Sequence, residues 1–188
     1  MAATQKHMEE LTQQAESGDA GGQYLTFMLA GEEYGVEILK VQEIKGWDTA
    51  TPIPNTPDYV LGVLNLRGAV VPIIDLRKRF SLDSVPYGAT TVVIVVKMSH
   101  EDQERTVGLV VDAVADVYRL ESGEIQPPPD MGGAVHTEFV RGLATVEEKM
   151  VILLEVDRLI DFRNMHASTS ESKSPDSEET QAEAEPEG

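Results

Sequence analysis

The stretch Gly35–Ile44 (GVEILKVQEI) decides the fold, because a similar stretch, Gly108–Val117 (GLVVDAVADV), occurs later in the chain. The two align without gaps and match in their glycine, in most apolar positions and in one acid. Further on, Gly62–Leu76 aligns in the same way on Gly142–Val156. Chance resemblance among valine-rich strands is the alternative explanation. Two blocks in the same order favour a duplication instead, which predicts two similar β subdomains with a binding groove between them.

Short β-rich runs separated by Gly, Pro, Asn or Asp fill the rest of this region. The runs are Tyr24–Leu29, Tyr34–Ile38, Val60–Leu66, Ala69–Leu76, Val92–Val96, Thr106–Val111 and Met150–Val156. Val92–Val96 is continuous and β-branched, which predicts a strand buried on both faces. Runs at this spacing favour an all-β fold of small barrels or a sandwich. Short helices are expected over Leu76–Phe80 and Glu155–Met165.

Composition narrows the classes of function. The 188 residues include 33 acidic and 15 basic side chains and no cysteine, and the formal net charge is −18. Such a charge repels nucleic acids and anionic membranes, so neither is an expected partner. Residues 1–22 and 164–188 are acidic and poor in apolar side chains, so we expect both ends to be disordered. Neither a signal peptide nor a membrane span is visible in the sequence, so we expect the cytoplasm and no membrane insertion.

The sequence shows no pattern typical of catalysis or metal binding. The histidines His7, His100, His136 and His166 do not stand at metal-ligand spacing, and no phosphate-binding glycine loop or nucleophile elbow is present. Asp75 and Asp112 each follow a hydrophobic strand, where a carboxylate either belongs to a site or caps the next turn. We favour capping. We therefore expect no enzyme activity, no metal and no cofactor.

Two segments favour a binding site. In Val41–Trp47 (VQEIKGW) apolar and charged residues interleave just after a strand, and in Asn65–Gly68 (NLRG) an arginine stands at the turn between two apolar strands. An ion pair between Arg67 and Glu43 would orient the guanidinium and leave donors free for a partner. The alternative for Arg67 is a solvated surface residue whose aliphatic stem covers the core.

Five blocks stand in one order along the chain and carry a resemblance to a known family. They are Glu33–Ile44 (EYGVEILKVQEI), Pro52–Pro57 (PIPNTP), Gly62–Gly68 (GVLNLRG), Val71–Leu76 (VPIIDL), and Val107–Asp112 (VGLVVD) with Val114 and Val117. Each resembles the corresponding segment of the CheW coupling proteins of bacterial chemotaxis. The resemblance extends over residues 23–163, and the number and order of the blocks make it specific.

The resemblance implies two small five-stranded SH3-like β-barrels that share a hydrophobic core, with a few short helices. We place the first barrel at about 23–90, the second at about 91–154 and a C-terminal helix at about 155–165. It also implies a non-catalytic adaptor, monomeric alone, that couples the cytoplasmic tips of methyl-accepting chemoreceptors to the histidine kinase CheA. The alternative is a CheW-like regulatory fragment of a larger signalling protein.

By resemblance, the receptor tip binds in the groove between the barrels. The matching positions are Ile38, Val41, Glu43, Ile44, Arg67, Val92, Gly108, Val114 and Val117. The kinase is expected to contact Val70 and, on a second surface, Gln126 and Met131. Gln126 and Met131 depart from the basic and the aromatic residue that the family resemblance leads us to expect there, which puts the strength of that contact in doubt.

Overall fold

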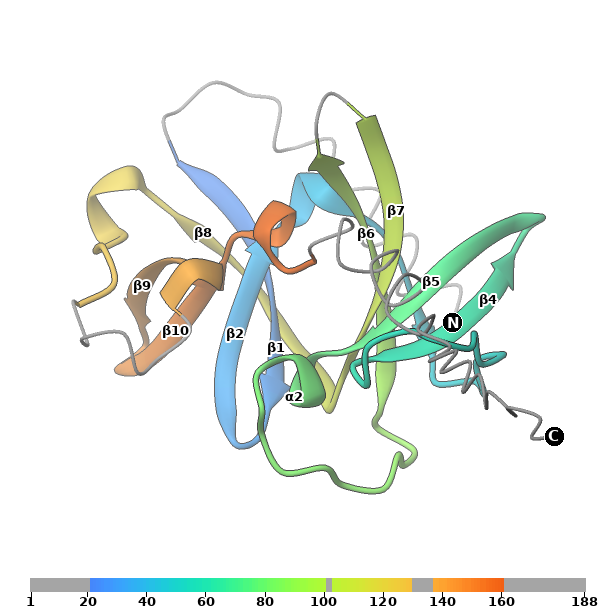
Figure 1. Ribbon diagram of the computed structural model, residues 1–188. Coiled ribbons are helices and arrows are strands. Elements are labelled where there is room, and N and C mark those ends of the chain that lie inside the picture. The colour runs from blue at the N-terminus through green and yellow to red at the C-terminus, as the bar shows by residue number, and fades with distance from the viewer. Residues whose placement is uncertain (1–20, 101–102, 130–136, 161–188) are drawn as a thin grey trace, which may run out of the picture.

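Ten β-strands make up most of the structure that a computed structural model describes, which comprises residues 21–100, 103–129 and 137–160 (Figure 1). The strands are β1 (Gly22–Leu29), β2 (Glu32–Glu37), β3 (Val41–Gly46), β4 (Val60–Leu66), β5 (Ala69–Asp75), β6 (Val92–His100), β7 (Gln103–Val111), β8 (Ala113–Leu120), β9 (Val140–Val146) and β10 (Lys149–Leu154). One short helix, α2 (Leu76–Arg79), and four 3-10 turns, η1 (Ile38–Lys40), η2 (Ser122–Glu124), η3 (Thr137–Phe139) and η4 (Val156–Arg158), join them. Within the described ranges no helix is long and apolar enough to cross a membrane.

The strands form two five-stranded sheets with equivalent orders. Sheet A has the order β8-β1-β2-β10-β9, and sheet B has the order β3-β6-β7-β5-β4. In each sheet an antiparallel hairpin, β1–β2 or β6–β7, pairs in parallel with β10 or β5 respectively. The equivalence confirms the duplication that the sequence predicts, since β6–β10 repeat the roles of β1–β5.

The two repeats exchange strands. β1 and β2 of the first repeat belong to sheet A, whose other strands come from the second repeat. β6 and β7 of the second repeat belong in turn to sheet B with β3, β4 and β5. The chain crosses between the sheets at η1 and again at Asp112, which are equivalent points of the two repeats. The predicted division into barrels at 23–90 and 91–154 is therefore wrong: sheet A combines residues 22–37 with 113–154, and sheet B is built from 41–111.

Most predicted strands are confirmed, and the misses have a common cause. The run Val60–Leu66 is strand β4 residue for residue, and four of the five residues of Val92–Val96 are fully buried. β3, β8 and β9 carry charged or small residues at several positions and were not predicted as strands. β1 begins at Gly22, within the segment expected to be disordered; residues 1–20 and 164–188 lie outside the described residues.

The two predicted helices fare differently. Helix α2 confirms the first of them. The described part of the second, up to residue 160, contains only the 3-10 turn η4 instead of an α-helix, and residues 161–165 lie outside the described ranges.

Three hydrophobic clusters hold the sheets together. One lies on sheet B and includes Val71, Ile73 and Val93. A second lies on sheet A and includes Tyr24 and Val151. The largest, which we call the shared core, joins both sheets through β1, β2, β6 and β7. Its burial supplies the main drive for the sheets to associate. The two five-stranded sheets and their shared core agree with the predicted all-β fold class.

The two carboxylates that follow strands serve the fold. Asp75 is the N-cap of α2 and accepts hydrogen bonds from the backbone of Arg77 and the hydroxyl of Tyr87. Asp112 accepts two bonds from the Arg77 guanidinium, at 2.7 and 2.6 Å, and one from the backbone N–H of Ala30. Asp75 thus caps the helix that follows it, as the capping interpretation predicts, whereas Asp112 bonds a side chain and a turn that precede it in the sequence.

Candidate functional site

The edge strands β3 and β8 present half-buried apolar side chains beside the shared core. β3 pairs with β6 on one side only, and β8 pairs with β1 on one side only. Five of the predicted receptor-binding residues are partly exposed and pack against the shared core: Val41, Ile44, Val92, Val114 and Val117. We call this set the seam. The structure therefore places residues from three strands of both sheets around one core.

Glu43 and Arg67 form the predicted ion pair. The Arg67 Nη2 lies 3.3 Å from the Glu43 Oε2, and the side chains are 77% and 21% exposed respectively. Arg67 occupies a left-handed position in the two-residue turn between β4 and β5, so its guanidinium reaches back to β3. The pair links the β4–β5 turn to the edge strand β3. Because a single contact orients an otherwise exposed guanidinium, most of its donors remain available to a partner.

Two predicted receptor-binding residues cannot present a side chain to a partner. Ile38 is 1% exposed and belongs to the shared core. Gly108 lies buried in the middle of β7, where a Cβ would stand 2.6 Å from the Ile73 side chain and 2.7 Å from the Val93 side chain. Both residues are buried below the surface, so the prediction that their side chains contact a partner directly is wrong.

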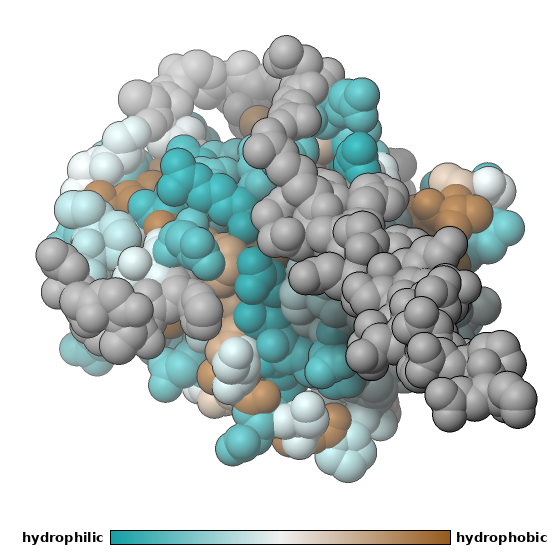
Figure 2. All heavy atoms as spheres, viewed as in Figure 1, coloured by the Kyte–Doolittle hydropathy of each residue, from teal (hydrophilic) through white to brown (hydrophobic). Residues whose placement is uncertain are grey.

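The predicted kinase-binding residues occupy different places. Val70 is 67% exposed on β5 in the hairpin β4–β5, where Figure 2 shows apolar atoms at the tip of the hairpin. Gln126 is exposed, and its backbone exchanges two hydrogen bonds of 2.8 Å with Leu143 on β9. Met131 lies outside the described residues. The structure does not bring Val70 and Gln126 together: the former belongs to sheet B, and the latter is bonded to sheet A.

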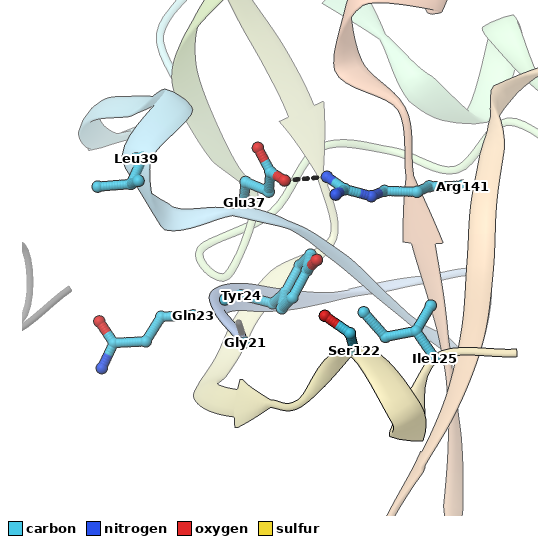
Figure 3. Close-up of a pocket in the computed structure, with 9 residues that line it drawn as sticks. Gly21, Gln23, Tyr24, Glu37, Leu39, Ser122, Ile125 and Arg141 are labelled. Atoms are coloured by element: carbon cyan, nitrogen blue, oxygen red, sulfur yellow. Dashed lines mark hydrogen bonds and ion pairs between the residues drawn. The ribbon is translucent and has the colours of Figure 1, made fainter. Parts of the chain in front are cut away.

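A cavity of about 240 Å³, with Ile125 in its wall, was not predicted from the sequence. Figure 3 shows the ion pair between Glu37 and Arg141 over the ring of Tyr24, with Ile125 at the opposite wall and Leu39 at the rim. Leu39 is 63% exposed. Because these residues come from four separate segments, no local sequence motif predicts the cavity.

The Tyr24 hydroxyl in the cavity keeps its proton at neutral pH. Burial raises the pKa of the Tyr24 hydroxyl, and the nearby Arg141 charge only partly opposes that shift. Tyr24 therefore stays protonated at neutral pH. Across the described parts of the chain, no group of three or more His, Asp or Glu side chains is arranged to hold a metal ion.

Comparisons with known proteins agree with the geometry. The family model of the CheW-like domain matches residues 23–163. The chemotaxis protein CheW of Klebsiella aerogenes is 46% identical over 145 residues, which cover 77% of this chain and 85% of that protein. The chemotaxis protein CheW of Rhizobium meliloti is 37% identical over 150 residues, which cover 80% of this chain and 94% of that protein. The crystal structure of scaffolding protein TtCheW from Thermoanaerobacter tengcongensis matches with a TM-score of 0.69 and 32% identity, over 79% of this chain and 94% of that one.

Proposed function

This chain belongs to the CheW family of non-catalytic chemotaxis scaffold proteins, and from that premise we propose that it couples methyl-accepting chemoreceptors to the histidine kinase CheA. Chemoreceptor tips are helical hairpins in the cytoplasm, so the adaptor would act there. The reading as a regulatory fragment of a larger signalling protein is the second candidate, and no feature of the described residues favours it.

The seam is the observation that carries the receptor half of the proposal. It offers partly exposed valines and an isoleucine on the edge strands β3 and β8 and at the start of β6, and the guanidinium paired with Glu43 on β3 is 77% exposed. An amphipathic helix binds such a surface by placing its apolar face on these side chains and a carboxylate near the arginine. Central apolar residues flanked by a charged anchor are the usual arrangement of residues that dominate binding energy.

For the kinase half, two separate surfaces support the proposal. Val70 is an exposed apolar side chain on a hairpin, and an apolar residue that is 67% exposed gains the most from being covered by a partner. Ile125, which precedes the exposed Gln126 in the chain, lines the cavity together with Tyr24 and Leu39, so concave surface lies next to that contact. Because neither surface overlaps the seam, one adaptor could hold receptor and kinase at once.

The test is a pair of separate binding measurements on the full chain. One uses a receptor signalling tip as the immobilised partner, and the other uses CheA. The proposal expects both to retain the chain and expects Val41→Asp to abolish retention by the receptor tip alone. Retention by neither partner would refute the proposal, and retention by only one would refute the coupling role.

A further inference from the structure

Each point at which the chain crosses between the sheets carries an ion pair. Lys40 in η1 lies at the first crossing, and its Nζ is 2.5 Å from the Oδ2 of Asp157 in η4. Asp112 lies at the second crossing, and its Oδ2 is 2.6 Å from the Nη2 of Arg77 in α2. We call these two contacts the crossing pairs. Their four side chains are between 14% and 28% exposed, so solvent screens each pair only in part.

Both crossing pairs stand where two parallel strands of different repeats end. β2 is parallel to β10, and Lys40 follows β2 as Asp157 follows β10. β7 is parallel to β5, and Asp112 follows β7 as Arg77 follows β5. Adjacent parallel strands have their carboxyl ends at the same edge of a sheet, so the residues that follow them meet there. Each pair therefore joins a residue of the first repeat to a residue of the second.

The charges of the crossing pairs differ systematically between the repeats. Lys40, at the crossing of the first repeat, is basic, and Asp112, at the crossing of the second, is acidic. Arg77, which follows β5, is basic as well. The residue in the same position of the second repeat is Asp157, one residue past the aligned block, and it is acidic. The first repeat thus supplies both cations, and the second repeat supplies both anions.

This distribution of charge disfavours sheets in which each hairpin stays with its own repeat. If β2 were parallel to β5 of its own repeat, Lys40 would face Arg77. If β7 were parallel to β10 of its own repeat, Asp112 would face Asp157. Like charges would then meet in contacts that now hold opposite charges, which is unfavourable where solvent is partly excluded. Both contacts attract only when the repeats exchange their hairpins.

Other contacts between the repeats do not favour exchange in the same way. Lys40 also lies 3.5 Å from Glu155, but the residue aligned with Glu155 is Asp75, which is acidic too. Apolar side chains of similar kinds occupy the aligned buried positions of both repeats, for example Ile73 and Leu153. Cores tolerate such replacements well, so burial alone gives little preference for one combination. The charges of the crossing pairs do distinguish the two combinations.

We propose that the crossing pairs select which hairpin joins which sheet. The β1–β2 hairpin is followed by a cation and fits the sheet in which β10 is followed by an anion. The β6–β7 hairpin is followed by an anion and fits the sheet in which β5 is followed by a cation. Selection of this kind concerns the chain's own fold, so it goes beyond the coupling function and depends on no partner.

A triple-cysteine variant of the full chain shows which combination has formed. Gln23 on β1 is the register partner of Arg119 on β8, and the residue aligned with Arg119 is Gly46 on β3. Gln23→Cys therefore stands beside Arg119→Cys in the exchanged sheets and would stand beside Gly46→Cys in unexchanged ones. The chain has no cysteine of its own, so a short bifunctional thiol reagent joins only these positions. Peptide mass spectrometry quantifies the 23–119 and 23–46 links after refolding from urea.

The decisive variant exchanges two charges and leaves the amino-acid composition unchanged. Arg77→Asp with Asp157→Arg places like charges in both contacts of the exchanged sheets and opposite charges in both contacts of the unexchanged ones. We expect the ratio of the 23–46 link to the 23–119 link to rise at least ~10-fold over the triple-cysteine parent. An unchanged ratio would overturn the proposal. Loss of both links would overturn it too, because the charges would then stabilise the fold without selecting a combination.

A rescue and a control separate selection from a general effect of charge. Adding Lys40→Asp and Asp112→Lys to the charge exchange makes both contacts of the exchanged sheets attractive again, so the 23–119 link should predominate as in the parent. Asp58→Arg with Arg105→Asp exchanges charges at two exposed positions outside the crossing pairs and should leave the ratio unchanged. Failure of the rescue, or an equal effect of the control, would refute selection by the crossing pairs.

Discussion

Replacing Arg67 by glutamate should separate folding from receptor binding. The side chain is 77% exposed and makes one contact of 3.3 Å with Glu43, so the pair contributes about 0.2–1 kcal/mol to stability. Charge reversal adds a repulsion of similar size between two partly solvated acids. The free energy of unfolding should therefore fall by about 1 kcal/mol, a small part of the ~5–15 kcal/mol typical of a domain.

The effect on binding should be much larger. If Arg67 is the charged anchor beside the seam, its reversal leaves a partner carboxylate facing a like charge in a desolvated contact. Losses of about 2–5 kcal/mol are typical for such pairs, which correspond to at least ~30-fold weaker binding of the receptor tip.

Two assays measure the two effects on the same samples. Urea unfolding followed by the fluorescence of Trp47, the chain's only tryptophan, gives stability, and the expected shift of the midpoint is about 0.3–1 M. Calorimetric titration with a receptor signalling tip gives affinity. Arg105→Glu, at an exposed position on the β6–β7 hairpin, is the matched control and should bind normally.

The charge-swapped double variant, Glu43→Arg with Arg67→Glu, makes the reasoning refutable. It restores the internal ion pair, so stability should recover, yet the anchor now points from β3 and binding should stay weak. Recovery of binding together with stability would show that only the ion pair matters. Unfolding of the single variant would show that Arg67 is structural and that the site is misread.

Three further predictions concern other parts of the molecule. Asp112→Asn should lower stability by about 2 kcal/mol at neutral pH, since the guanidinium bonded to this carboxylate lowers its pKa in the folded state. Urea midpoints should show this difference shrinking as the pH falls below ~3.9, where the carboxyl of the unfolded chain takes up a proton, and vanishing once the pH falls through the lower pKa of the folded state. Gly62→Ala should cost more than ~3 kcal/mol in the same assay, because φ is 136° and the new Cβ would stand 2.0 Å from the Thr51 carbonyl oxygen, whereas Gly46→Ala, with nothing within 4 Å, should change stability by less than ~1 kcal/mol. Val70→Asp should weaken retention by immobilised CheA while leaving stability and receptor binding unchanged. If the variant binds CheA and the receptor tip equally weakly, Val70 is not specific to the kinase contact.

The sequence predicts the buried strands well and their partners poorly. The run Val60–Leu66 identifies β4 because burial selects apolar residues at successive positions. Pairing partners are not local: Glu33 in β2 lies beside Val151 in β10, and no periodicity connects positions so far apart. The strand exchange between repeats therefore escapes sequence reasoning, although the duplication itself does not.

The candidate site shows the same division. The opposite charges of the two side chains predict the Glu43–Arg67 pair, since an arginine in a turn attracts an acid on a neighbouring segment. Family resemblance adds Ile38 and Gly108, but resemblance carries no information on exposure, and both are buried. The cavity under the Glu37–Arg141 pair depends on four segments meeting in space, so only the fold reveals it.

The exchange of strands has a mechanical consequence for an adaptor. Both walls of the seam are edge strands whose hydrogen-bonded neighbour comes from the other repeat: β3 is bonded to β6, and β8 to β1. A force applied at either wall is thus borne by backbone hydrogen bonds in both halves of the chain. Because each edge strand is hydrogen-bonded to the other repeat, a displacement at one contact surface should move both sheets together.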